Sequence, residues 1–209
     1  MIQAPGIVQA PRHYIVTKRA LDLAICIVLL PVVVPVGLLC AVLIRLDSSG
    51  PVMFAQMRTG QHGVRFPMFK FRTMVQNADA LKASLQHLNI LPAPDFKIPD
   101  DPRITRVGRI LRKTSLDELP QLLNVIRGEM SIVGPRPTSF SAGTYDLWHS
   151  ERLEVTPGIT GLWQIKGRGT MTFDERLRLD IEYMERRTIM LDLKLMAMTA
   201  LAVLRRSGA

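Results

Sequence analysis

The longest apolar run in the chain extends from Ala20 to Leu46, and its only charged residues lie near its two ends. It exceeds the ~20 apolar residues that a membrane-spanning helix needs. Pro31 and Pro35 stand in its middle, where each removes a helical hydrogen bond and clashes with the preceding turn. A helix broken there can enter one leaflet and return on the same side if its freed backbone groups are satisfied.

Three interpretations of this run compete. A cleaved signal peptide also has a basic start, but this apolar part is too long and no clear small-x-small site follows it. A simple span conflicts with the two prolines. Cations flank both ends, which places both on the cytoplasmic side: Lys18, Arg19 and Arg45. We therefore predict a leader at 1–17 and a re-entrant membrane helix hairpin at 18–46, broken near the prolines.

Shorter apolar patterns begin after Asp47. The runs 52–55 and 66–71 are rich in strand-forming residues and lie on either side of a turn at 60–63. In a strand, Lys70 and Arg72 point to one face, where two neighbouring cations are unfavourable without an anion. The alternative is a solvated edge strand that uses charge to prevent aggregation.

Most of the remaining chain is helical in pattern. We expect helices over 75–91, 138–155, 173–187 and 189–204. A proline-rich loop at 92–102 and a glycine-punctuated loop and strand at 156–169 interrupt them. The predicted class is therefore α+β, mostly helical, with a cytoplasmic catalytic domain at 47–187. The segment 188–209 is predicted to be a C-terminal interfacial amphipathic helix, although packing in the core is the alternative.

The stretch 116–137 holds the candidate chemistry. It starts with Asp117 and Glu118, continues with apolar residues spaced as one helix face, and ends in the stiff loop Gly134–Pro137, which carries Arg136. Paired acids aimed past an arginine loop suggest phosphate handling with a metal.

A purely structural role for the acids is equally open. Ser115 and Glu118 fit a capping box. Pro120 argues against that register, because it would then delete a bond inside the helix. With Asp117 as the cap, the proline falls where its amide would be unpaired anyway. We therefore expect Asp117 at the cap.

Arginines recur every three residues before the acids, at Arg103, Arg106, Arg109 and Arg112. They predict a basic amphipathic helix that leads directly into Asp117. Most of them fit a solvated or membrane-surface stripe. Arg112 is nearest the acids and is our functional candidate.

Composition narrows the class of partner. The formal net charge of +9 and the pI of about 10.1 favour acidic partners, such as nucleic acid, anionic lipid or phosphorylated substrates. Aromatic residues make up only 6%, which is few for stacking on single-stranded bases. Cys26 and Cys40 lack CxxC spacing, so a zinc site is not expected, and nothing requires a disulfide.

At this point the motifs resemble the bacterial small monotopic phosphoglycosyl transferases, also called the bacterial sugar transferase family, over nearly the whole chain. The matching motifs are Lys18-Arg-x-Leu-Asp22, Gly50-Pro-Val-Met-Phe54, Gln56-x-Arg58-x-Gly60, Lys70-Phe-Arg-Thr-Met74, Ser115-Leu-Asp-Glu-Leu-Pro-Gln121, Gly128-Glu-Met-Ser-Ile-Val-Gly-Pro-Arg-Pro137, Pro157-Gly-Ile-Thr-Gly-Leu-Trp-Gln164, Asp180-Ile-Glu-Tyr183 and Asp192-Leu-Lys194. Each motif alone is weak, but all of them in this order are specific. The family often has serine before the kink proline, where this chain has Val34.

The resemblance implies transfer of a sugar-1-phosphate from a UDP-sugar to undecaprenyl phosphate, with release of UMP. Asp117 matches the nucleophile that would form an aspartyl-phosphosugar intermediate. Glu118 matches its acidic neighbour, and the pair is expected to hold Mg2+. Phosphate contacts are expected from Lys70, Arg72, Arg112 and Arg136. Asp180 matches a further acidic position, with a sugar or metal contact as its expected role.

The same resemblance places the protein at the cytoplasmic leaflet of the bacterial inner membrane, where it would initiate surface glycan assembly. A homo-oligomer, the sugar and the pathway stay open. One alternative is a non-catalytic, basic, membrane-tethered module that binds nucleic acid or lipid. Another is a glycosyltransferase that releases UDP.

Overall fold

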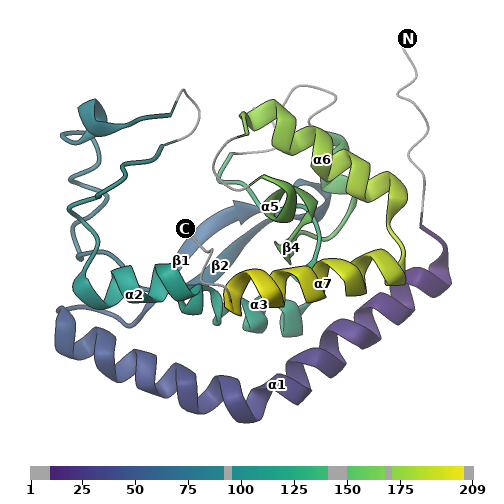
Figure 1. The fold of residues 1–209 in the computed structure, drawn as a ribbon, viewed down its shortest axis with the longest axis horizontal. Coiled ribbons are helices and arrows are strands. Elements are labelled where there is room, and N and C mark those ends of the chain that lie inside the picture. Colours follow the sequence, from purple (N-terminus) through teal and green to yellow (C-terminus); the bar gives the residue numbers. More distant parts are fainter. Residues whose placement is uncertain (1–9, 92–95, 141–149, 168–170, 205–209) are drawn as a thin grey trace.

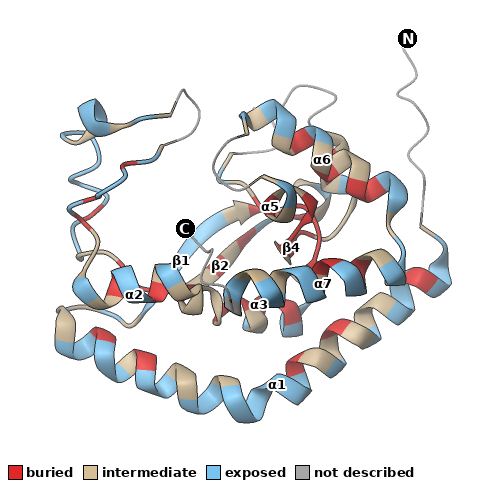
Figure 2. Ribbon diagram, in the orientation of Figure 1, coloured by how far each residue is buried: buried red, intermediate tan, exposed pale blue. Residues whose placement is uncertain are grey.

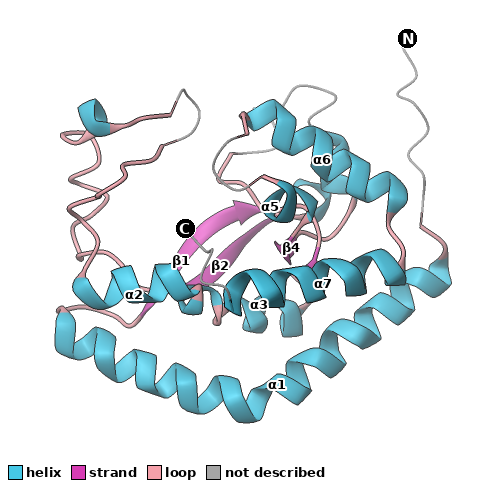
Figure 3. Ribbon diagram, in the orientation of Figure 1, coloured by secondary structure: helices cyan, strands magenta, loops and turns pink. Residues whose placement is uncertain are grey.

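The computed structural model describes residues 10–91, 96–140, 150–167 and 171–204. One long helix lies beneath a body of shorter helices and two small sheets (Figure 1). Helices dominate the described residues and strands are short (Figure 3), so the predicted mixed and mostly helical class is confirmed.

Helix α1 (Arg12–Asp47) is 36 residues long and contains both prolines. The sequence predicts a break into a hairpin, whereas the structure has one helix that bends near its middle (Figure 1). Pro31 and Pro35 lie about one turn apart, so the hydrogen bonds that they remove are close together. Such a gap bends a helix, while the bonds before and after it keep the helix continuous.

The helix also begins earlier than predicted. Arg12 is its first residue, so the last part of the predicted leader at 1–17 is helical. Residues 1–9 of that leader lie outside the described residues. The basic pair Lys18 and Arg19 thus lies about two turns into the helix rather than at its start.

The apolar side chains of α1 face outward. Val28 is 75% exposed and Leu38 is 65% exposed, and most of the bend is uncovered in Figure 2. The helix is long and apolar enough to cross a membrane, and only 11% of its most apolar stretch is buried. A core helix of a soluble protein would bury this surface, so the exposed face indicates association with a membrane.

The first sheet is the antiparallel pair β1 (Met53–Thr59) and β2 (Arg65–Phe71), with Met53 opposite Phe71. Both predicted strands are confirmed, and both are longer than predicted. A 3-10 turn, η1 (Gln61–Gly63), joins them.

The second sheet is the parallel pair β3 (Ser131–Val133) and β4 (Gly158–Thr160). A Cβ atom at Gly158 would lie 2.1 Å from the backbone nitrogen of Gly134. Any side chain would therefore separate the two segments. The strand expected within 156–169 is confirmed by β4, which continues into the short helix α5 (Leu162–Lys166).

The other helices are α2 (Arg106–Thr114), α3 (Gln121–Arg127), α6 (Phe173–Arg186) and α7 (Ile189–Leu204). Single 3-10 turns occur at η2 (Gln86–Leu88), η3 (Leu116–Glu118) and η5 (Glu151–Glu154). The basic helix is confirmed from Arg106 onward, but Arg103 precedes it and forms a buried ion pair with Asp101.

The helix predicted over 75–91 is wrong. The segment consists of turns that extend away from the body beside α2, with η2 as its one regular turn (Figures 1 and 3). Its residues are largely exposed, so no apolar face is buried to stabilise a helix. Half of the helix predicted over 138–155 falls on residues 141–149, outside the described residues, and its end is the 3-10 turn η5.

Helix α7 packs against the body on one side. Leu195 is 2% exposed and Asp192 is fully buried, whereas Met190 on the opposite side is 74% exposed. The sequence predicts an interfacial amphipathic helix here. Because the exposed side is also apolar, the amphipathic pattern is not confirmed, and core packing accounts for the buried side.

Candidate active site

The paired acids lie on a turn between two helices. Ser115 has a left-handed backbone (φ 58°) that ends α2, and the chain then forms the 3-10 turn η3. Asp117 lies inside that turn, and Pro120 is the residue immediately before α3. The prediction that Asp117 caps the helix is therefore wrong. The proline still lies where no helical hydrogen bond is lost, which was the reason for that prediction.

Glu118 is held by two cations. Its Oε1 atom lies 2.9 Å from Lys70 Nζ and 2.5 Å from Arg136 Nη2. Arg136 also donates to the carbonyl oxygen of Ile159 at 3.3 Å. Burial alone would raise the pKa of Glu118, but the Arg136 and Lys70 charges outweigh it and hold that pKa well below its usual value. Glu118 is thus a fixed anion.

Asp117 is less tightly held. Its Oδ2 atom lies 3.9 Å from Lys70 Nζ, beyond hydrogen-bond distance, and the residue is only 9% exposed. Burial raises the pKa of Asp117, while the charges of Lys70, Arg112 and Arg136 oppose that rise. The result is a buried carboxylate that lies near cations but forms no ion pair shorter than 3.9 Å with the described residues, and such a group is suited to attack an electrophile.

Two basic residues complete this cluster. Burial lowers the pKa of Lys70 against the opposing attraction of Glu118. Arg112 donates from Nε to Thr73 Oγ1 at 2.9 Å, and the attraction of Asp117 acts on its guanidinium. The structure therefore brings together five of the candidate residues: Lys70, Arg112, Asp117, Glu118 and Arg136.

Arg72 is not part of this cluster. Its guanidinium donates to the carbonyl oxygens of Ser48, at 2.8 Å, and of Ser49. Strand β2 ends at Phe71, so the alternation that would place Arg72 beside Lys70 no longer applies. In this structure Arg72 braces the turn after α1 instead of facing the acids.

Asp180 lies on α6, in a second buried cluster. Its Oδ2 atom is 2.7 Å from Arg152 Nη2, and both side chains are almost fully buried. Burial raises the pKa of Asp180 to about 7, although Arg152 and Arg176 oppose the rise. The sequence did not indicate Arg152, because nothing in the pattern around it pairs it with a residue so distant along the chain.

The donor set suits a hard cation that arrives with its substrate. The described residues contain no group of three or more His, Cys, Asp or Glu side chains placed to hold a metal. Asp117 and Glu118 offer carboxylate oxygens side by side. Mg2+ is typically bound by one or two carboxylates together with substrate phosphates. The two acids fit that mode of binding.

Comparison with known proteins agrees with this arrangement. The model of the family described as bacterial sugar transferase matches residues 13–206. The chain is 41% identical to galactosyl transferase CpsE of Streptococcus agalactiae over 198 residues, which are 94% of this chain and 44% of the relative. It is 43% identical to the undecaprenyl-phosphate galactose phosphotransferase of Salmonella typhimurium over 92% of this chain and 41% of the relative.

A third relative matches over most of both chains. The exopolysaccharide production protein ExoY of Sinorhizobium fredii is 40% identical over 90% of this chain and 85% of its own length. The chain thus spans less than half of the first two relatives and most of the third. The match of the family model and the match to ExoY lead to one conclusion: this chain belongs to the bacterial sugar transferase family.

Proposed function

We propose that this protein transfers a sugar-1-phosphate from a UDP-sugar to undecaprenyl phosphate and releases UMP. The observation that carries the proposal is a buried, weakly paired Asp117 beside Lys70, Arg112 and Arg136. Relatives named undecaprenyl-phosphate galactose phosphotransferase and undecaprenyl-phosphate glucose phosphotransferase support the acceptor and the reaction class. The product would begin assembly of a bacterial surface glycan.

The reaction proceeds in two displacements. A carboxylate oxygen of Asp117 attacks the β-phosphorus of the UDP-sugar, and the bond from that phosphorus to the bridging oxygen breaks. UMP leaves with the electron pair, and an aspartyl-phosphosugar remains. A phosphate oxygen of the lipid then attacks the same phosphorus and restores the carboxylate, so one difficult displacement becomes two.

The basic residues make the first displacement possible. An anionic carboxylate and an anionic diphosphate repel each other, and fixed cations offset that repulsion. Arg136 and Arg112 can contact phosphate oxygens with two donors each, while Lys70 supplies a point charge. Lys70 also lies between both acids. Asp117 is therefore directed toward a site that is already electropositive.

Glu118, with Asp117, would hold Mg2+ beside the diphosphate. When bound, the ion supplies positive charge that neutralises phosphate oxygens. Glu118 stays ionised because its pKa is held low, so it is ready to bind a cation throughout the physiological pH range.

The location follows from the two substrates, since a soluble nucleotide sugar meets a lipid phosphate. We propose that α1 enters the cytoplasmic leaflet of the inner membrane and returns, with the catalytic residues at headgroup level. The exposed apolar side chains of α1 and its bend support this placement. Arg45, which is exposed near the end of α1, would face the headgroups, whereas Lys18 points into the body, where its Nζ atom lies 3.2 Å from Asp192.

Cysteine labelling distinguishes this topology from a span. Single cysteines at His13→Cys and Ser49→Cys, in a background without Cys26 and Cys40, mark exposed positions before and after the bend. We expect both to resist a membrane-impermeant maleimide in intact cells and both to react after permeabilisation. Replacing Pro31 and Pro35 with alanine restores helical hydrogen bonds and is expected to expose one of the two sites. Labelling of one site in the unmodified helix would contradict the proposal.

Nucleotide release tests the reaction itself. The protein is incubated in detergent with Mg2+ and a panel of UDP-sugars, with and without undecaprenyl phosphate. We expect sustained UMP release that requires the lipid, and the best donor identifies the sugar. Release of UDP would instead indicate a glycosyltransferase. Salt-sensitive binding of nucleic acid without nucleotide release would favour the binding module, which finds no support in the family relationship.

A further inference from the structure

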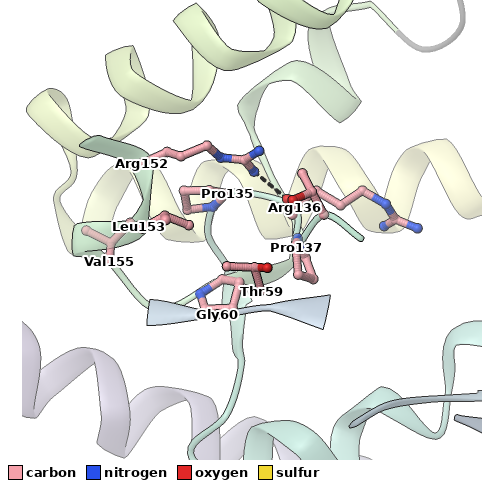
Figure 4. A pocket seen from close by; sticks show the side chains of 10 residues that line it. Thr59, Gly60, Pro135, Arg136, Pro137, Arg152, Leu153 and Val155 are labelled. Atoms are coloured by element: carbon pink, nitrogen blue, oxygen red, sulfur yellow. Dashed lines mark hydrogen bonds between the residues drawn. The ribbon is translucent and has the colours of Figure 1, made fainter. Parts of the chain in front are cut away.

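Arg136 is held at both of its ends. Its guanidinium reaches Glu118, while its backbone carbonyl oxygen accepts a hydrogen bond from Arg152 Nη2 (Figure 4). In that view the Arg136 side chain points away from Arg152, so the two contacts act on opposite sides of the residue. Arg152 belongs to η5, and its partner Asp180 belongs to α6. A line of contacts therefore runs from α6 through Arg152 to the active-site arginine.

The rest of this loop is fixed by backbone contacts. The amide of Gly134 donates to Thr160 at 2.9 Å, and the carbonyl oxygen of Pro135 accepts from Gly158 at 2.9 Å. On the far side, Thr138 pairs with Thr59 of β1. Arg136 lies between these backbone contacts. The side chain of Arg152 donates a hydrogen bond to the carbonyl oxygen of Arg136.

The ion pair is poorly explained by stability alone. Both side chains are almost completely buried, at 4% and 2% exposure. Removing two charges from water costs free energy that their attraction often fails to recover. The raised pKa of Asp180 agrees, because its charged form is disfavoured in the folded protein despite the partner. The ion pair between Arg152 and Asp180 contacts the loop that carries Arg136, so a role in positioning that loop explains why the pair is there.

We propose that Asp180 and Arg152 are positioning residues, which fix the backbone of Arg136 so that its guanidinium reaches Glu118 and the phosphates of the donor. This inference rests on the proposed function for its catalytic consequence. It differs from the sequence-based expectation of a sugar or metal contact, because Asp180 contacts Arg152 and acts through it.

The test replaces the pair without leaving an unpaired buried charge. Single substitutions would strand one charge and destabilise the fold. The double variant Asp180→Leu/Arg152→Met keeps the branching of the aspartate and nearly the length of the arginine, and replacement of a buried ion pair by apolar residues is often neutral for stability. We expect its melting temperature to stay close to that of the unmodified protein. We expect UMP release to fall about 30-fold or more, as displaced active-site groups commonly cause.

A second background shows whether the pair acts through Arg136. In an Arg136→Ala protein, the same double variant should lower the residual rate by less than about threefold, because residues that act through one partner are not additive. Glu182→Gln is the matched control: Glu182 lies on α6, as Asp180 does, but its partly exposed carboxylate pairs with Lys166 of α5, and its loss should leave the rate unchanged. An equal loss in both backgrounds would overturn the proposal.

Amide exchange gives a readout that does not need activity. We expect faster hydrogen exchange at the backbone amides of Gly134, Arg136 and Thr138 in the double variant and no change in Glu182→Gln. Unchanged exchange would overturn the positioning role, whereas absent UMP release from the unmodified protein would overturn only the proposed reaction. If this variant unfolds, the polar pair Asp180→Asn/Arg152→Gln is used in its place. If both unfold, the pair is a structural element and the inference fails.

Discussion

Replacing Asp117 with asparagine is expected to reduce UMP release by at least about a thousandfold, as the loss of a covalent nucleophile typically does. The amide is isosteric but lacks the negative charge that makes a carboxylate oxygen nucleophilic toward phosphorus. The fold should be unaffected, because burial disfavours the charged form of Asp117 and the neutral amide removes that cost. We expect an unchanged or slightly higher melting temperature, measured alongside the rate.

A single-turnover experiment separates a nucleophile from a residue that only binds the donor. With UDP-sugar but no lipid, the unmodified protein should release at most one UMP per chain in a burst. Asp117→Asn should show no burst, and mass spectrometry should detect a sugar-phosphate adduct on the unmodified protein alone. A burst in the variant, or a rate near that of the unmodified protein, would remove Asp117 from the proposed role.

The pH profile gives an independent check on the same residue. Asp117 attacks only when ionised, and burial raises its pKa, so the rate should fall with decreasing pH from above the ~3.9 of an ordinary aspartate. Lys70 must stay protonated, and burial lowers its pKa, so the basic limb should lie below the ~10.4 of an ordinary lysine. Lys70→Arg should remove the basic limb and leave the acid limb in place.

Helices and strands could be predicted from the sequence where the spacing of apolar residues indicated which face is buried. Strand β2 and helix α6 have apolar residues at regular positions that are buried in the body, among them Phe66, Met68 and Leu177. The segment 75–91 has helix-forming residues but no apolar stripe, and its turns lie away from the body. Helix propensity alone was not enough to make this segment helical, because no tertiary packing stabilises a helix there.

The site was predictable in part for a related reason. Asp117, Glu118 and Arg136 belong to one continuous stretch, and Lys70 lies on a strand whose alternation is regular. Arg72 was misplaced because it lies one residue after the strand ends, where side-chain direction is set by the following turn. Its contact with Ser48, like that between Arg152 and Asp180, depends on segments that only the fold brings together.

Removal of Mg2+ is expected to stop nucleotide release, and Glu118→Gln should weaken the response to the ion. In the structure, Glu118 Oε1 faces both Lys70 and Arg136. Glutamine would leave those two cations without their shared anion, and the pKa of Lys70 would fall further because the attraction that opposes its burial is lost. The site would become more positive, so binding of an anionic donor should not weaken.

The variant should therefore separate catalysis from binding. We expect kcat to fall about a hundredfold, the KM for donor to stay level or decrease, and the Mg2+ concentration for half-maximal rate to rise about tenfold or more, as for altered metal ligands and their neighbours. Glu182→Gln, which removes a partly exposed carboxylate on α6, is the control. Full activity in the presence of excess chelator would show that the reaction does not require a metal ion. A lower kcat with unchanged Mg2+ dependence would mean that Glu118 only organises Lys70 and Arg136, because a carboxylate that holds the ion cannot be neutralised without weakening its affinity.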